Sequence, residues 1–266
     1  MNRLSIIGAV LLGGTSLASA ADLGRIPTKA PPVIPAQVWS WTGFYAGVHA
    51  GYGFGSDDDI DTSGQAPANV ANVLGGARPA RVGLDRDGFI GGGQAGYNWQ
   101  FAPNWLLGIE ADISYTDFRE TTSVTTLPLA GPGTLLNTFS SRLEYLGTVR
   151  GRIGYVFDRT LVYATGGLAY GDVRNSVNFF GTAGQLQFTG STSSVETGYT
   201  VGGGIEHAFL PNWTVKGEYL FYDLGRNTVN VAVIPGSGGG GTGYNSTFRN
   251  EGHIARVGLN YRFGAM

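Results

Sequence analysis

The amino-acid sequence predicts an all-β fold, an eight-stranded antiparallel up-and-down transmembrane β-barrel. Glycine accounts for 45 of the 266 residues, well above the usual share of roughly 7%, and it destabilises helix interiors by about 1 kcal/mol per position. Eight segments alternate between apolar and polar residues, as strands do. Their connections alternate between tight turns and long stretches, which is typical of barrels in the bacterial outer membrane.

The composition excludes several classes of protein. The chain has no Cys, which excludes a disulfide-stapled fold, and its 5 Trp, 13 Tyr and 14 Phe exclude a disordered chain. The net charge of -2 gives no sign of a nucleic-acid partner, and we expect none.

Residues 1–20 have the pattern of a secretory signal peptide. Arg3 supplies the positive charge, residues 4–12 are apolar, and Ala18 and Ala20 form a small-residue cleavage site. The alternative is a transmembrane helix, but the apolar run is interrupted at Gly13, well short of the roughly 20 apolar residues needed to span a membrane. Residues 21–40 contain four prolines and are expected to form an extended periplasmic tail.

Residues 41–266 are expected to form the barrel, because successive strand side chains point to opposite faces and each segment has one apolar face. The first four segments lie near residues 43–54, 89–101, 105–116 and 142–157. Their apolar faces are, in order, Phe44, Val48, Tyr52 and Phe54; Phe89, Tyr97, Trp99 and Phe101; Trp105, Leu107, Ile109 and Ile113; and Leu143, Tyr145, Val149 and Ile153.

The last four segments follow the same rule near residues 160–173, 199–209, 213–221 and 255–263. The fifth segment does not show which of its two faces is the apolar one, because both the odd and the even positions include apolar residues. The remaining apolar faces are, in order, Tyr199, Val201, Ile205 and Phe209; Trp213, Val215, Tyr219 and Phe221; and Ala255, Val257, Leu259, Tyr261 and Phe263.

The connections place all tight turns at one end of the barrel. Tight turns are expected at residues 102–104, 158–159 and 210–212, and the long stretches near residues 55–86, 119–140, 174–195 and 225–250 are expected to be surface loops. Outer-membrane barrels have short periplasmic turns, long outside loops and an even number of strands. The N-terminal tail and the C-terminus are therefore expected in the periplasm, with four loops outside.

An aromatic girdle is predicted near the tight turns, because residues 101–105 (FAPNW) recur as residues 209–213 (FLPNW). Aromatic rings prefer the membrane–water interface. The alternative is an ordinary hydrophobic staple of each hairpin. The predicted girdle comprises Trp99, Phe101, Trp105, Tyr155, Phe157, Phe209, Trp213, Tyr261 and Phe263.

The charged residues of the strands are predicted to face the lumen. An Arg on the lipid face at the bilayer midplane costs about 2 to 4 kcal/mol, and the interior of an eight-stranded barrel is just wide enough to be filled by side chains. We therefore expect a charge network that plugs the lumen, made of Glu110, Asp112, Arg142, Glu144, Arg150, Arg152, Glu206, Lys216, Glu218, Arg256 and Arg262.

Four stretches of the chain carry a resemblance to a known family: residues 41–47 (WTGFYAG), 147–155 (GTVRGRIGY), 163–171 (YATGGLAYG) and 258–263 (GLNYRF). In combination they resemble the alphaproteobacterial outer-membrane β-barrel proteins, a family that includes surface antigens of Brucella and Rhizobium. The resemblance implies an OmpA-like eight-stranded domain, a structural role in the cell envelope and, in some members, haemin binding. It also implies insertion by the barrel-assembly machinery, although residues 264–266 (GAM) here follow the usual terminal aromatic residue.

Taken together, the sequence predicts a structural protein of the cell outer membrane that contributes to envelope integrity and contacts lipid and lipopolysaccharide. We expect no catalytic, metal or cofactor site, since His49, His207 and His253 are scattered and form no Ser-His-acid constellation. One alternative is a porin-like protein that binds or transports haemin or small solutes. The other is a lipid-modifying enzyme that uses His207 or His253.

Overall fold

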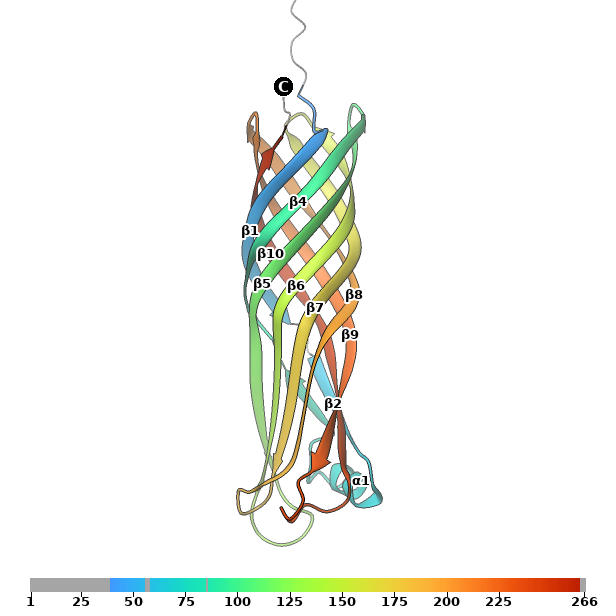
Figure 1. The fold of residues 1–266 in the computed structure, drawn as a ribbon, viewed down its shortest axis with the longest axis vertical. Helices are drawn as coiled ribbons and strands as arrows, with labels where there is room; N and C mark the ends of the chain where they lie inside the picture. The colour runs from blue at the N-terminus through green and yellow to red at the C-terminus, as the bar shows by residue number, and fades with distance from the viewer. Residues whose placement is uncertain (1–38, 56–57, 85, 264–266) are drawn as a thin grey trace, which may run out of the picture. The chain divides into compact units, whose positions relative to one another are not determined.

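The computed structural model describes residues 39–55, 58–84 and 86–263 (Figure 1). The predicted signal peptide, nearly all of the Pro-rich tail and residues 264–266 lie outside this part of the chain, so these assignments stay predictions.

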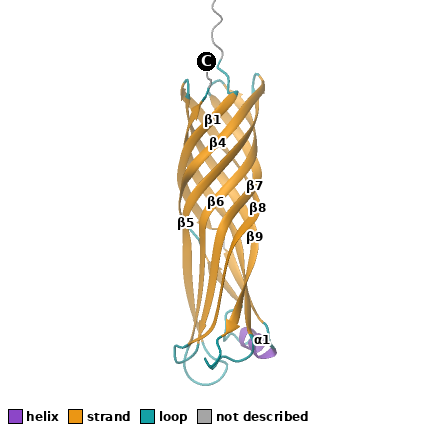
Figure 2. Ribbon diagram, in the orientation of Figure 1, coloured by secondary structure: helices purple, strands orange, loops and turns teal. Residues whose placement is uncertain are grey.

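Eight of the ten described strands close into an antiparallel ring (Figures 1 and 2). Each strand pairs with its neighbour in the chain, and β1 pairs with β10 to close the ring. The prediction of an eight-stranded up-and-down barrel is therefore confirmed. The ring is formed by β1 (Gly43–Gly55), β4 (Gly88–Ala102), β5 (Trp105–Thr126), β6 (Leu135–Phe157), β7 (Thr160–Phe180), β8 (Leu186–Leu210), β9 (Trp213–Val233) and β10 (Gly243–Arg262).

The first long connection contains two further strands and a helix. These are β2 (Asp58–Gly64), α1 (Pro67–Leu74) and β3 (Arg81–Leu84). Because β1 and β4 stop early, β2 takes the place of β1 beside the far part of β10, and β3 pairs with β2. No helix in the described ranges is long and apolar enough to cross a membrane.

The predicted loops near residues 119–140, 174–195 and 225–250 are mostly strand, so their assignment as loops was wrong. The strands that flank them continue to shorter connections at residues 127–134, 181–185 and 234–242. The physical reason lies in composition: residues 119–126 (RETTSVTT) are rich in Thr, which favours a pleated surface. We call residues 58–84, 117–143, 173–198 and 224–251 the extension, since they project beyond the ends of β1 and β4 (Figure 1).

The three tight turns lie where they were predicted, all at one end of the ring. Asp158 has a positive φ of 52°, which the two-residue turn between β6 and β7 requires. In both copies of the FxPNW motif the turn is bonded to the next strand: Asn104 Nδ2 donates to the Val156 carbonyl on β6, and Asn212 Nδ2 donates to the Arg262 carbonyl on β10, both at 2.9 Å.

The outward faces of the ring are apolar and the inward faces are buried. The sequence did not decide which face of β7 points outward. In the structure Leu161 and Tyr163 point inward, and Val162 and Leu168 point outward. We call the outward set the apolar belt; its members include Phe44, Val48, Phe89, Ile109, Ile113, Val149, Ile153, Leu168, Val201, Ile205 and Val257.

One break in the alternation changes the faces of β6. The pairing of β5 with β6 shifts register between Tyr115 and Phe118, and that of β6 with β7 shifts between Leu143 and Leu146. Leu143 and Leu146 are both buried although they are three residues apart. Such a bulge inserts an extra residue and exchanges the two faces of the strand beyond it. Leu143, which was predicted to face outward, therefore points into the lumen.

Candidate functional site

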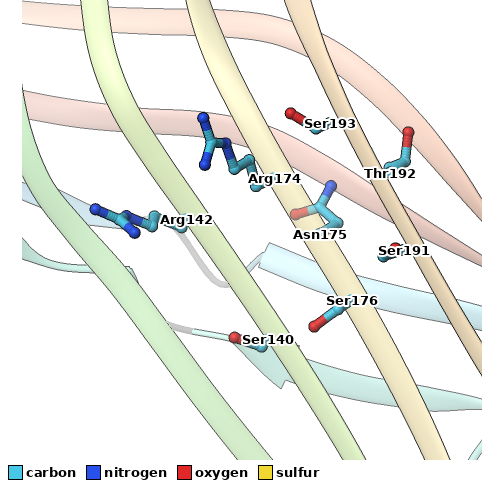
Figure 3. Close-up of a pocket in the computed structure, with 8 residues that line it drawn as sticks. All are labelled: Ser140, Arg142, Arg174, Asn175, Ser176, Ser191, Thr192 and Ser193. Atoms are coloured by element: carbon cyan, nitrogen blue, oxygen red, sulfur yellow. The ribbon is translucent and has the colours of Figure 1, made fainter.

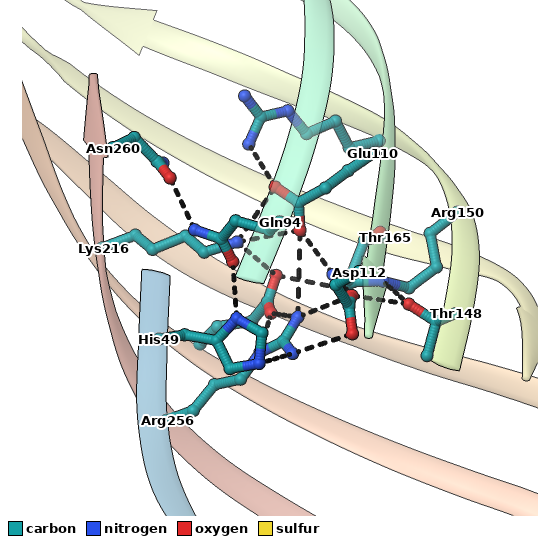
Figure 4. A network of polar contacts seen from close by, with 12 residues as sticks. His49, Gln94, Glu110, Asp112, Thr148, Arg150, Thr165, Lys216, Arg256 and Asn260 are labelled. Atoms are coloured by element: carbon teal, nitrogen blue, oxygen red, sulfur yellow. Dashed lines mark hydrogen bonds and ion pairs between the residues drawn. The ribbon is translucent and has the colours of Figure 1, made fainter. Parts of the chain in front are cut away.

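The lumen contains a charged layer to which all eight ring strands contribute a buried polar side chain. Figure 4 shows much of its network of contacts. Strand register places opposite charges directly across from one another in three places: β5 against β6, β8 against β9, and β9 against β10. Opposite-charge pairs at directly facing positions stabilise a sheet. The pairs are Glu110 with Arg150, Glu206 with Lys216, and Glu218 with Arg256.

Arg150 is the centre of this layer. Its Nη2 atom lies 3.0 Å from Asp112 Oδ2 and also contacts Glu110, and its Nη1 atom lies 3.1 Å from Glu218 Oε1. The Arg150 side chain has no exposed surface. Hydrogen bonds between charged groups are stronger than neutral ones, and their number here offsets the cost of burying the charges.

Lys216 connects opposite walls of the barrel. Its Nζ atom lies 2.8 Å from Glu110 Oε1, and β9 and β5 are four places apart in the ring of eight. Arg256 on β10 adds contacts to Glu218 and Asp112, with its Nε atom 2.7 Å from Glu218 Oε2. At this level a direct ion pair therefore joins opposite sides of the ring.

Arg152 completes the layer on the side of the tight turns. Its Nη1 atom lies 3.1 Å from Glu206 Oε2, and its guanidinium group lies 4.6 Å from the ring centroid of Tyr45. The Tyr45 hydroxyl donates to Glu110 at 2.7 Å, and that of Tyr163 donates to Glu218 at 2.9 Å. The layer therefore combines four acids with four bases and has no net charge.

Sequence reasoning missed several members of the layer. His49 contacts Gln94 at 3.1 Å and Ser114 at 2.7 Å, and Gln94 donates to Asn260. These residues occupy the same alternate, inward-facing positions of their strands as the charged residues. The alternating pattern could therefore have predicted that they face the lumen. Tyr45 and Tyr163 were harder to find, because an aromatic residue on a polar face carries no such signal.

Three of the predicted network residues lie elsewhere. Arg142 and Glu144 point outward, where they pair at 3.4 Å. The bulge in β6 exchanges the inward and outward positions of the strand, and the prediction assumed unbroken alternation. Arg262 is buried at the tight-turn end, and its guanidinium lies 4.4 Å from the ring centroid of Trp39 and 5.5 Å from that of Trp41. The other eight predicted residues come together in the charged layer.

Apolar layers flank the charged layer on both sides. At the tight-turn end, Trp41 packs with residues that include Leu106 and Leu161. On the other side lies a cluster that includes Phe118 and Leu220. A third cluster fills the extension and comprises Ile60, Val82, Leu84, Phe139, Val177, Phe179, Phe188, Val229, Val231, Tyr244 and Phe248.

The nine residues of the predicted girdle all lie exposed around the tight-turn end. Several contact one another, with ring centroids of Trp105 and Tyr155 5.3 Å apart and those of Trp213 and Tyr261 5.2 Å apart. Their place at a membrane interface stays a prediction.

The three histidines lie in separate environments. His49 belongs to the charged layer, His207 contacts Thr160, and His253 accepts or donates a hydrogen bond with the Tyr219 hydroxyl at 2.7 Å. Within the described ranges, no group of three or more His, Asp or Glu side chains is arranged to hold a metal ion.

Comparison with known proteins places the chain in a family. The pattern of the outer membrane protein beta-barrel domain matches residues 7–263. The chain belongs to this family. It is 37% identical to the 31 kDa outer-membrane immunogenic protein of Brucella melitensis over 97% of this chain and 98% of that protein. It is 31% identical to the 22 kDa outer membrane protein of Rhizobium leguminosarum over 72% of this chain and 67% of that protein.

Solved structures of outer-membrane barrels are also similar to the chain. The outer membrane protein OprG of Pseudomonas aeruginosa is 11% identical, with a TM-score of 0.45, and the match covers 86% of this chain and 99% of that chain. The predicted family and the outer-membrane location are confirmed by the family match and the named relatives.

Proposed function

We propose that this member of the family is a structural, non-conducting protein of the outer membrane that supports the envelope and presents the extension at the cell surface. The ion pair between Lys216 and Glu110 across the barrel carries this proposal. The two apolar clusters that flank the charged layer and the third in the extension support it, because each consists of side chains buried from solvent.

The proposed orientation puts the tight turns and both termini in the periplasm. A transmembrane β-strand needs about 9 to 11 residues, whereas β5 to β10 have 20 to 25. The excess lies in the extension, where the outward side chains of β5 change from apolar to Asp117, Arg119, Thr121 and Ser123. A polar outer surface of this kind suits water and sugars rather than hydrocarbon.

We infer further that the protein has no enzymatic activity. Its relatives are named as outer-membrane immunogenic proteins, and the three histidines lie apart from one another in three different environments.

The test is a conductance measurement on the folded protein in planar bilayers. Gel migration with and without boiling first establishes that the barrel is closed. We expect current indistinguishable from that of the protein-free membrane, and an open porin in the same membrane serves as the positive control. Steady channel openings would contradict the plugged lumen.

A further inference from the structure

The outer surface of β6, β7 and β8 carries a polar groove just beyond the apolar belt (Figure 3). The groove has a volume of about 370 Å³. It combines two guanidinium groups with the hydroxyl groups of four serines, and none of its lining residues is acidic. The lining residues are Ser140, Arg142, Arg174, Asn175, Ser176, Ser191, Thr192 and Ser193.

Strand register arranges the groove in two rows. Arg142 faces Arg174 directly, and Arg174 faces Ser193. The next row outward has Ser140 opposite Ser176, which faces Ser191. Because the period of a strand is two, both rows point to the same outer surface. Asn175 lies between the rows and turns its side chain inward, where it accepts a hydrogen bond from Ser141.

The arginine row has more positive charge than a sheet normally places together. Arg119 on β5 faces Arg142, so three arginines stand directly opposite one another on three neighbouring strands. Like charges in directly facing positions destabilise a sheet. The row therefore requires negative groups close by.

Carboxylates of this chain meet that requirement, since each of the three arginines has one beside it; Arg119 contacts Asp117. Glu144 lies 3.4 Å from Arg142 Nη1 and 2.9 Å from Arg174 Nη2, and Asp172 lies 3.1 Å from Arg174 Nη2. A guanidinium has five N–H donors, and these contacts use only some of them. The side chains of Arg142 and Arg174 are 41% and 49% exposed, so their remaining donors are open to a ligand from outside the chain.

The position of the groove indicates which ligand is available. On β6 the arginine row begins a few residues beyond Val149 of the apolar belt, with Tyr145 and Glu144 between them. This is the level at which a membrane around the belt presents its outer headgroups. Arg binds phosphate with two parallel hydrogen bonds, and serine hydroxyl groups both donate to and accept from sugar hydroxyls.

We propose that the groove binds the phosphorylated sugar headgroup of lipopolysaccharide in the outer leaflet. Arg142 and Arg174 hold the phosphate, and the serine row contacts the sugar. The proposal rests on the orientation proposed above, with the extension outside, but it is independent of whether the lumen conducts.

The test titrates the folded protein in detergent with diphosphorylated lipid A and measures binding by native mass spectrometry. The variant R142Q/R174Q removes both charges from the groove. The matched control is R226Q/R249Q, because Arg226 and Arg249 also face each other across two strands but do not line the groove. Gel migration with and without boiling establishes that each variant is folded.

We expect R142Q/R174Q to weaken lipid A binding at least about tenfold, which is the loss of one or two charge-assisted hydrogen bonds. The control variant and the wild-type protein should bind alike, and lipid A stripped of its phosphates should bind as weakly to the wild type as intact lipid A binds to R142Q/R174Q. An equal loss of lipid A affinity in both variants, or equal binding of lipid A with and without its phosphates, would overturn the proposal. Glucose 1-phosphate that binds as tightly as lipid A would also overturn it, because the site would then recognise a free sugar phosphate.

Discussion

At the scale of single residues, Arg150 and Arg142 show how the exchange of faces at the bulge in β6 sets the contribution of a side chain to stability. Both are arginines on β6, yet Arg150 is fully buried against three carboxylates and Arg142 is about two-fifths exposed beside Glu144. Removing one member of a buried ion cluster leaves its partners without compensation, whereas an exposed pair is screened by water.

We therefore expect Arg150→Met to lower the free energy of unfolding by about 3 to 5 kcal/mol. Arg142→Met should lower it by about 1 kcal/mol or less. The measurement is urea unfolding in lipid vesicles, followed by the shift between the folded and unfolded bands on a gel. Equal effects of the two substitutions would contradict the burial of the charged layer.

At the scale of elements, the extension has a core of its own that is separate from the charged layer. Ile60 on β2 is 1% exposed within this core, and β2 pairs only with β3 and the far part of β10 among the described strands. Loss of packing at Ile60 should loosen the extension without opening the ring.

We expect Ile60→Ala to cost about 2 to 5 kcal/mol locally, as core truncations do, and to make the extension more sensitive to limited proteolysis. The gel migration of the folded barrel should not change. Asp61→Ala, at the exposed neighbouring position, is the control and should leave proteolysis unchanged. A barrel that itself unfolds in the Ile60 variant would show that the two cores are coupled.

Element by element, the ring was predictable and the extension was not. Strands such as β1 alternate bulky apolar residues with glycine and His49, so both their existence and their faces could be predicted. Residues 119–126 consist mainly of Thr and Ser, which show little contrast between the two faces and were assigned to a loop. The bulge at Glu144 and Tyr145 has no signature in the sequence, because an extra residue becomes visible only through strand pairing, and this is why Arg142 and Glu144 were assigned to the wrong face.

At the scale of the whole barrel, buried side chains lie in successive layers along the inside. The charged layer lies between two apolar clusters, and the extension contains a third. Under the non-conducting role proposed above, the apolar clusters are by themselves sufficient to stop ions, since crossing an apolar region without water costs an ion many kcal/mol.

The double variant K216A/E110A removes the ion pair that crosses the barrel. We expect it to be less stable than the wild-type protein but still non-conducting in planar bilayers, because the flanking clusters remain. An ohmic current in this variant, with none in the wild type, would mean that the charged layer alone closes the lumen.

The continuation of the strands beyond the belt also sets how far the tips stand from the cell. About ten residues of β5 lie in the extension, and at a rise of about 3.3 Å per residue they span up to roughly 30 Å. In the orientation proposed above, an extension of this length would hold the connecting tips within the inner part of a carbohydrate coat. We then expect antibodies and other large molecules to reach those tips more readily than the ring, and we expect substitutions at the tips to leave the ring intact.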